Sequence, residues 1–234
     1  MTTRTAAVVE PSNSRNIKVE RRKVDNEQRT IVGLKTITSL LKSGKSKIND
    51  QAKIMSWKKN KKSSDQVFAL LELDQMGENL FTNPKFKTWL KYVDKTVKVQ
   101  TKSAMIATLT AKYGDDGLAR LLQAAKNGRE SKLADMLQTE QMWVWLTGTK
   151  GKSTDDIFHL LKLDEGVDKV LTNPNLQAWD DYIKFYNSKF DVKNPTTTFD
   201  SLKRFYGDEK MAKMLEAAKK EPTTRKIAMK LQTA

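Results

Sequence analysis

Residues 63–74, with the sequence SSDQVFALLELD, decide the fold of this chain because they return almost in full 90 residues later. Residues 153–164 read STDDIFHLLKLD, and the apolar positions of the two segments coincide. Each segment begins with hydroxyl side chains followed by acidic or amide groups, which cap the first turn of a helix, and then continues with an apolar run. A chain of 234 residues that repeats such a segment is expected to contain two copies of one helical unit.

The repeat extends well beyond this segment. Thr-Asn-Pro occurs at residues 82–84 and again, 90 positions later, at residues 172–174. Tyr-Gly-Asp occurs at residues 113–115 and at 206–208, 93 positions apart, which places an insertion around residues 191–195. Proline cannot continue a helix but suits its first position, so each Thr-Asn-Pro marks the end of one helix and the start of the next.

The helices that follow these markers have apolar faces at helical spacing. One face consists of Phe86, Trp89, Leu90, Val93 and Val97 in the first copy, and of Leu176, Trp179, Ile183, Tyr186 and Phe190 in the second. A later helix carries Leu118, Leu121, Leu122 and Ala125, and its copy carries Met211, Met214, Leu215 and Ala218. We interpret Trp89, Tyr113, Trp179 and Tyr206 as core residues rather than as side chains that stack on a ligand. Because no window alternates with a period of two, we predict an all-α fold with essentially no sheet.

The net charge of +15 is concentrated near the N-terminus. Residues 1–62 contain 16 Lys and Arg against 5 Asp and Glu, whereas residues 63–234 contain 27 against 23. Residues 1–30 are poor in large apolar side chains, so we expect a disordered basic arm there. Nucleic-acid binding or nuclear entry, led by this arm and by the basic cluster at residues 58–62, stays an alternative function, but the nearly balanced body makes nucleic acid the less favoured partner.

The chain offers little for catalysis or for metal binding. Cysteine is absent, and the single histidine, His159, has an alanine at the same place in the first copy, so we expect a partly buried structural residue. The Gly-Lys-Ser triplets at residues 44–46 and 151–153 lack the earlier glycine of a phosphate loop. Asp180 and Asp181 project about 100° apart on a helix with solvent available, so they form no dyad. We therefore expect a non-enzymatic protein without cofactor, metal or small-molecule substrate.

No stretch approaches the ~18 apolar residues that a membrane-spanning helix needs. We therefore expect no membrane span. The first ten residues contain one apolar run, at residues 6–9, which is too short for the hydrophobic region of a signal peptide.

A tryptophan-bearing helix followed by a helix at Tyr-Gly-Asp resembles the WY module of oomycete RXLR effectors, which plant pathogens secrete and which act inside host cells. The residues that carry the resemblance are Trp89 with Tyr113 and Trp179 with Tyr206. It spans residues 31–234 and implies two tandem WY-type helical bundle units. We expect the first unit at residues 31–128 and the second at residues 129–234.

The second unit has an additional element ahead of its tryptophan helix. Residues 131–138, with the sequence SKLADMLQ, and the tryptophans after them are similar to the L motif of LWY units, which joins one unit rigidly to the next. The residues that this resemblance places between the units are Leu133, Leu137, Trp143 and Trp145. Residues 143–146 also match the aromatic-x-x-aliphatic pattern of autophagy-type interaction motifs, and packing between the units is the favoured interpretation.

The arm carries a further resemblance. Asp25, Asn26, Glu27, Gln28 and Arg29 are similar to the acidic-Glu-Glu-Arg element that follows the RXLR motif in these effectors, with glutamine at one acidic position. Residues 15–18, RNIK, depart from the RXLR motif itself.

The resemblance implies a secreted effector that acts in the cytoplasm, or also in the nucleus, of host plant cells. Its activity would be binding to a host protein to suppress or redirect immunity. Some tandem WY–LWY effectors act as adaptors that recruit the scaffold subunit of host protein phosphatase type 2A, so this subunit is one expected partner. The surface positions that differ between the two copies are where we expect specificity to lie.

Overall fold

A computed structural model describes residues 48–97, 101–148, 151–190 and 194–232. These residues form α-helices and two short 3-10 helices without any β-strand, which confirms the predicted all-α fold. The first unit consists of α2 (Ile48–Lys59), α3 (Ser64–Leu70), η1 (Leu73–Gln75), η2 (Gly77–Asn79), α4 (Pro84–Thr96) and α5 (Thr101–Lys126). The joint helix is α6 (Ser131–Thr147). The second unit consists of α7 (Thr154–Leu160), α8 (Val167–Val170), α9 (Leu176–Lys189), α10 (Thr198–Tyr206), α11 (Asp208–Lys220) and α12 (Pro222–Gln232).

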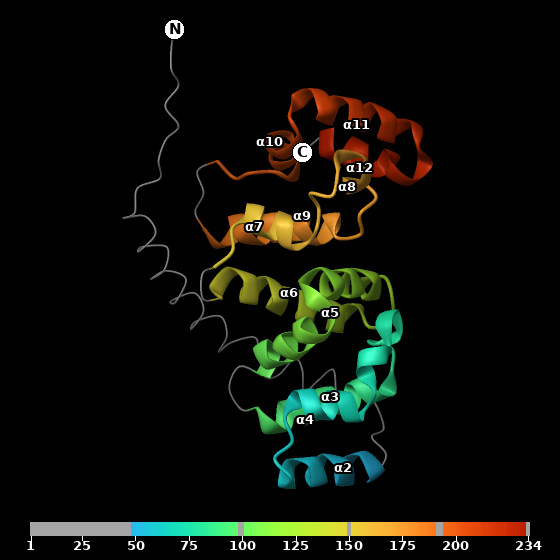
Figure 1. Cartoon of the computed structure of the whole chain (residues 1–234), viewed down its shortest axis with the longest axis vertical. Coiled ribbons are helices and arrows are strands. Elements are labelled where there is room, and N and C mark those ends of the chain that lie inside the picture. Colours follow the sequence, from blue (N-terminus) through green and yellow to red (C-terminus); the bar gives the residue numbers. More distant parts are fainter. Residues whose placement is uncertain (1–47, 98–100, 149–150, 191–193, 233–234) are drawn as a thin grey trace, which may run out of the picture.

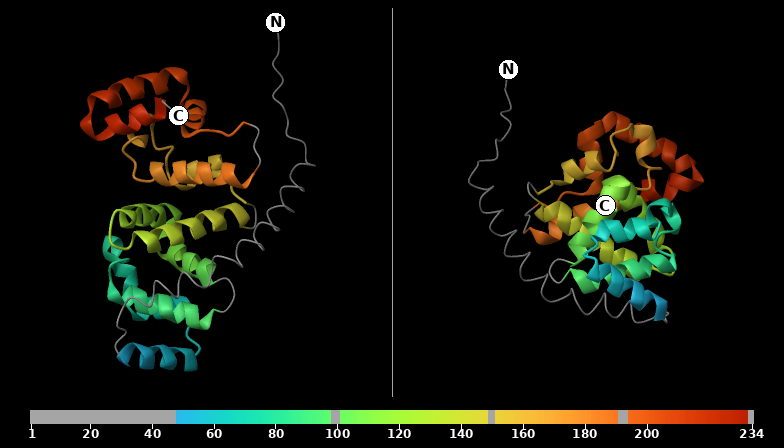
Figure 2. Two further views of the ribbon diagram at one scale, coloured as in Figure 1. Left: turned by 180° about the vertical axis from the view of Figure 1, so that it is seen from behind. Right: turned by 60° about the horizontal axis from the view of Figure 1, so that its bottom comes forward.

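The two units are stacked along the long axis of the molecule (Figure 1). Helix α2 lies at one end, α11 and α12 lie at the other, and α5 and α6 lie in the middle, where the two units meet. The view from behind shows the same order along the axis (Figure 2). The repeat in the sequence therefore corresponds to a repeat along one direction in space.

The predicted caps begin the helices of both units. The side-chain oxygen of Ser63 accepts from the backbone N–H of Gln66, whose side chain accepts in return from the Ser63 N–H. Ser153 and Asp156 make the same reciprocal pair at the start of α7. Asn83 caps α4 by accepting from the N–H of Lys85, and the proline between them occupies the first helical turn. Each cap satisfies backbone N–H groups that have no partner inside the helix.

Two clusters of buried apolar side chains form the core. The first joins α2, α3, α4 and α5 to the first half of α6, and the second joins the helices of the second unit to Met142 and Trp145 of α6. Ala119, on α5, packs into the second cluster with no exposed surface. Helix α6 thus belongs to both clusters, and the boundary predicted between residues 128 and 129 stays a prediction.

Both units turn at matching backbone positions with positive φ. Glu72 and Lys162 have φ of 58° and 56° and lie two residues after the ends of α3 and α7. Gly114 and Gly207 have φ of 71° and 81° within Tyr-Gly-Asp. At Gly114 the chain bends within α5, whereas at Gly207 the same bend separates α10 from α11. The glycine of each Tyr-Gly-Asp is needed because side chains are strained in this conformation.

We expect Gly114→Ala to lower the free energy of unfolding by about 1–3 kcal/mol, the usual cost of holding a side chain in a glycine-only region. An added Cβ would also lie 3.0 Å from Oδ1 of Asp116. Urea unfolding measures the loss. Gly117→Ala is the matched control, since that glycine is helical and its added Cβ would meet the Cβ of Tyr113 at an ordinary 3.5 Å. Equal losses in both variants would contradict the assigned role of the bend.

Several predictions concern residues outside the described ranges. These are the disordered basic arm at residues 1–30, the acidic-Glu-Glu-Arg-like element and the Gly-Lys-Ser triplet at residues 44–46.

Candidate functional site

The tryptophan of each unit is fixed by the same two features. Trp89 and Trp179 have no exposed surface. The indole Nε1–H of Trp89 donates to the carbonyl oxygen of Ser64 at 3.0 Å, and that of Trp179 donates to Thr154 at 2.8 Å. Because the accepting carbonyls lie in the first turn of α3 and α7, each bond ties the tryptophan helix of its unit to α3 or to α7.

In each unit two tyrosine hydroxyls donate hydrogen bonds to backbone carbonyls, at equivalent positions in the two units. The hydroxyls of Tyr92 and Tyr182 donate to the carbonyls of Lys62 and Lys152 at 2.5 and 2.7 Å, just before α3 and α7 respectively. The hydroxyls of Tyr113 and Tyr206 donate to the carbonyls of Leu73 and Leu163 at 2.7 and 2.6 Å. Burial raises the pKa of Tyr113 and of Tyr206, so both phenols stay protonated and keep donating. All four bonds are therefore structural.

Helix α6 holds the two units together through Trp145. Its indole Nε1–H donates to Oδ1 of Asp115 at 2.6 Å, and its ring packs edge-on against Tyr182 with centroids 5.5 Å apart. Trp145 is only 2% exposed. One turn earlier, Gln141 donates to the backbone carbonyl of Asp115 at 3.1 Å. A single buried ring thus contacts the bend of the first unit and the tryptophan helix of the second.

Polar contacts reinforce this joint from both sides. The ammonium of Lys126 and the amide of Gln123, both on α5, reach Oδ2 of Asp181 on α9 at 3.0 and 3.1 Å. Lys162 and Asp116 form a second ion pair between the units at 2.9 Å. Lys126 and Asp181 are each 24% exposed, so this pair is less screened by water than an ordinary surface pair. The joint therefore has an apolar centre and a charged rim.

The other L-motif residues divide between the two units. Leu133 and Leu137 pack into the first cluster. Trp143 faces the second unit, where its ring meets Phe185 edge-on at 5.0 Å and the ammonium of Lys189 lies 5.1 Å from its centroid. Within residues 143–146 Trp145 and Leu146 are buried and helical, so the autophagy-type pattern is not presented as an extended segment.

The two acidic side chains of α9 have largely different partners. Asp181 belongs to the joint, whereas Asp180 is 14% exposed, which makes it less solvated than the sequence suggests. Asp180 accepts from Thr198 at 2.5 Å, from Lys184 at 2.8 Å and from Lys230 at 3.1 Å. Burial would raise the pKa of Asp180, but these hydrogen bonds outweigh it and hold the pKa below its usual range.

This lowered pKa predicts an acid sensitivity of the second unit. A carboxyl group whose pKa is lower in the folded state stabilises that state above its unfolded pKa, and the stability is lost as the pH falls through the folded pKa. We expect Asp180→Asn to remove part of the loss of thermal stability between neutral pH and strong acid. Melting temperatures measured at several pH values test this. An unchanged pH dependence in the variant would contradict the role given to Asp180.

His159 does not have the environment predicted for it. Its side chain is 57% exposed and its Nδ1 lies 2.7 Å from Oδ2 of Asp164, so the expectation of a partly buried residue is wrong. Phe158, the residue before it in α7, is buried, whereas position 159 itself faces solvent. Within the described residues no three acidic or histidine side chains gather where a metal ion could bind.

The Gly-Lys-Ser triplet at residues 151–153 also has a structural role. Ser153 is the N-cap of α7 and the Lys152 carbonyl accepts from Tyr182. In the described part of the chain no helix is both long and apolar enough to cross a bilayer.

Sequence reasoning named the tryptophans of the L motif as inter-unit residues but missed the polar contacts of the joint. Asp115, Gln123, Lys126 and Asp181 are ordinary polar residues of helices, and nothing in their local sequence marks them as neighbours. A sequence feature that could have pointed to the joint is that Asp181 is not shared by the two copies, since the first copy has Lys91 at that position.

Comparison with known proteins gives one consistent answer. Residues 52–93 match the family described as "Effector PexRD54, WY-domain". An RxLR effector protein of Phytophthora infestans is 37% identical over 178 residues, which cover 75% of this chain and 47% of the relative. RxLR effector protein PSR2 of Phytophthora sojae is 34% identical over 183 residues, which cover 77% of this chain and 27% of that protein.

A solved structure agrees with the sequence relatives. "The Crystal Structure of PcRxLR12" superposes with a TM-score of 0.59 at 35% sequence identity, covering 84% of this chain and 46% of that one. The chain therefore spans half or less of the length of these relatives.

Proposed function

Since this chain belongs to the RxLR effectors built of WY-type units, which are secreted pathogen proteins, we propose that it acts inside host plant cells by binding a host protein and so suppresses or redirects immunity. The observation that carries this proposal is the fixed joint. Trp145 and the Lys126–Asp181 pair hold the units in one orientation, so their surfaces form a single extended platform.

The distribution of shared and unshared residues supports binding rather than catalysis. The residues that the two units have in common are caps, turns and core aromatics, and the contacts described above account for them. Among the positions at which the units differ, those on the exposed surfaces are where we expect a partner to be selected. We therefore place partner recognition at unshared exposed positions, and we propose a non-enzymatic role.

The test is affinity purification of the whole protein from plant cells, followed by mass spectrometry. We expect one host protein to be enriched by the parent chain and several-fold less by a joint variant, Asp181→Lys, which sets like charges at Lys126. The compensating double variant, Asp181→Lys with Lys126→Asp, should recover the capture because it restores the ion pair with its polarity reversed. Equal enrichment by all three proteins would show that the joint plays no part in binding.

The scaffold subunit of host protein phosphatase type 2A is a specific candidate for this partner, and the resemblance to tandem WY–LWY effectors supports it. Purified chain and purified scaffold subunit should then form a complex by size-exclusion chromatography. Separate elution at concentrations of tens of micromolar, on the order of weak cellular affinities, would exclude this candidate and leave the general proposal standing.

The basic cluster at residues 58–62 keeps the nucleic-acid alternative testable. The side chains of Lys58, Lys59, Lys61 and Lys62 are exposed, so changing all four to glutamine removes charge without touching the core. Removing residues 1–62 as a whole is unsuitable, because Ile54 of α2 is 2% exposed and Trp57 packs edge-on against Tyr92 at 5.9 Å. Loss of RNA or DNA binding, or of nuclear entry, in the glutamine variant would favour this alternative, whereas unchanged binding to nucleic acid would contradict it.

A further inference from the structure

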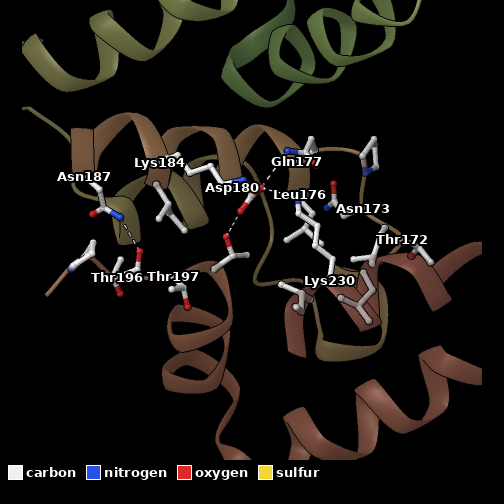
Figure 3. A pocket seen from close by; sticks show the side chains of 17 residues that line it. Thr172, Asn173, Leu176, Gln177, Asp180, Lys184, Asn187, Thr196, Thr197 and Lys230 are labelled. Atoms are coloured by element: carbon white, nitrogen blue, oxygen red, sulfur yellow. Dashed lines mark hydrogen bonds and ion pairs between the residues drawn. The ribbon is translucent and has the colours of Figure 1, made fainter. Parts of the chain in front are cut away.

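The second unit contains a cavity of about 420 Å³ between α9, α12 and the segment that leads into α10. Figure 3 shows the side chains around it. Cavities that bind small organic ligands commonly measure about 300–1,000 Å³. This cavity is therefore large enough for a small organic molecule.

Most of the cavity wall is apolar. It is formed by aliphatic side chains from three places in the second unit, which are Leu171 after α8, Leu176 and Ile183 of α9, and Ile227 and Leu231 of α12. Apart from Ile227, which packs against them, these side chains are buried members of the second core cluster. Because the packing of that core fixes their positions, the wall is formed before any ligand binds.

Polar side chains at the cavity are held by other groups of the protein. The side-chain amide of Asn187 donates to the backbone carbonyl of Thr196 at 2.8 Å, as Figure 3 shows. The hydroxyl of Thr197 donates to the carboxylate of Asp200, also at 2.8 Å, at the start of α10. A ligand would therefore gain its affinity chiefly by burying apolar surface against the wall.

The three charged side chains that line the cavity bond to one another. Oδ2 of Asp180 accepts from Lys184 at 2.8 Å and from Lys230 at 3.1 Å, and Figure 3 shows Asp180 beside both. Oδ1 of Asp180 accepts from Thr198. The two lysine side chains are more than half exposed, so solvent screens their remaining positive charge.

This arrangement selects against an ionised ligand. A charged group that enters an apolar cavity loses its hydration, and the loss is costly unless a partner compensates for it. A cation would also meet the two ammonium groups, and an anion would compete with Asp180 for them. An uncharged molecule avoids all three costs.

We propose that this cavity binds a small uncharged molecule with an apolar body. The body lies against the leucine and isoleucine side chains of α9 and α12. Water is a poor competitor at such a wall, because a bound water needs about two to four polar partners. Such a site goes beyond host-protein binding and does not depend on it.

Isothermal titration calorimetry with adamantanemethanol, a compact and uncharged alcohol, tests the site on the whole protein. We expect saturable binding of one molecule per chain. Adamantanecarboxylate and adamantanemethylammonium carry the same apolar body with a negative or a positive charge. Each should bind at least about tenfold more weakly, because its charged group loses hydration. No saturable heat from the alcohol, or an affinity of either ion equal to that of the alcohol, would overturn the proposal.

A pair of variants locates the binding. Ile227→Phe places a larger side chain in the cavity from α12 and should weaken adamantanemethanol at least about tenfold. Leu160→Phe is the matched control and should bind like the parent protein, since Leu160 is also partly buried against the second cluster but does not line the cavity. Circular dichroism reports whether both variants fold, and the comparison of the three ligands carries the test if Ile227→Phe does not. Equal affinities in the two folded variants would overturn the proposal.

Discussion

Replacing Trp179 with alanine should lower the free energy of unfolding by about 3–5 kcal/mol, the cost of truncating a buried tryptophan. The side chain has no exposed surface, and its ring centroid lies 4.8 Å from that of Phe158. Its indole Nε1–H donates to the carbonyl oxygen of Thr154. The substitution therefore opens a cavity and also leaves a buried acceptor without its donor. Domains are typically stable by only about 5–15 kcal/mol, so the second unit would be largely lost.

Urea unfolding followed by circular dichroism measures this loss. Trp179→Phe keeps part of the ring packing but removes the N–H donor together with part of the indole ring, so we expect a loss smaller than that of the alanine variant. Met55→Ala is the surface control, since that side chain is 71% exposed. If the alanine variant at residue 179 were no less stable than the one at residue 55, the core assignment of the shared tryptophans would be wrong.

Replacing Trp145 with alanine should have a comparable cost, about 3–5 kcal/mol, but at a different place. This ring is 2% exposed and joins Asp115 of the first unit to Tyr182 of the second. Its removal leaves the charged rim of the joint and the smaller contacts of Trp143, Met142 and Ala119 with the second unit, and partly exposed ion pairs contribute little. We therefore expect the units to lose their cooperativity and to unfold in two separate transitions.

Differential scanning calorimetry distinguishes a single transition from two. The acceptor side of the joint offers a graded comparison. Asp115→Asn keeps an oxygen acceptor for the indole N–H and should change stability little, whereas Asp115→Ala leaves the N–H unpaired and should cost about 1–3 kcal/mol. A single transition for Trp145→Ala, at a temperature close to that of the parent protein, would refute the role of α6 as the joint.

The elements that sequence reasoning predicted share a physical origin. Caps, the proline at a helix start and the apolar spacing of a helix all act within a few residues of each other. Ser63 and Pro84 each reveal their role through neighbours in the chain. The repeat then doubled the information, because Trp89 and Trp179 occur in matching local sequences.

The elements that were missed depend on residues distant in the chain. Lys126 and Asp181 are 55 positions apart, and their pairing follows only from the way α6 turns one unit against the other. His159 was placed wrongly because an apolar local sequence does not say which side of a seven-residue helix faces solvent. A cavity of about 420 Å³ beside Asp180 has no local signature either, since α9, α12 and the segment that leads into α10 line it together.

The chain's sequence by itself thus determined that two similar helical units exist, where their helices start and turn, and which aromatic side chains they bury. Only the tertiary structure decided how the units are joined and where a cavity lies beside Asp180. The physical reason is that capping and backbone strain are local properties, whereas the contacts of Trp145 and the space beside Asp180 arise only when distant helices pack together.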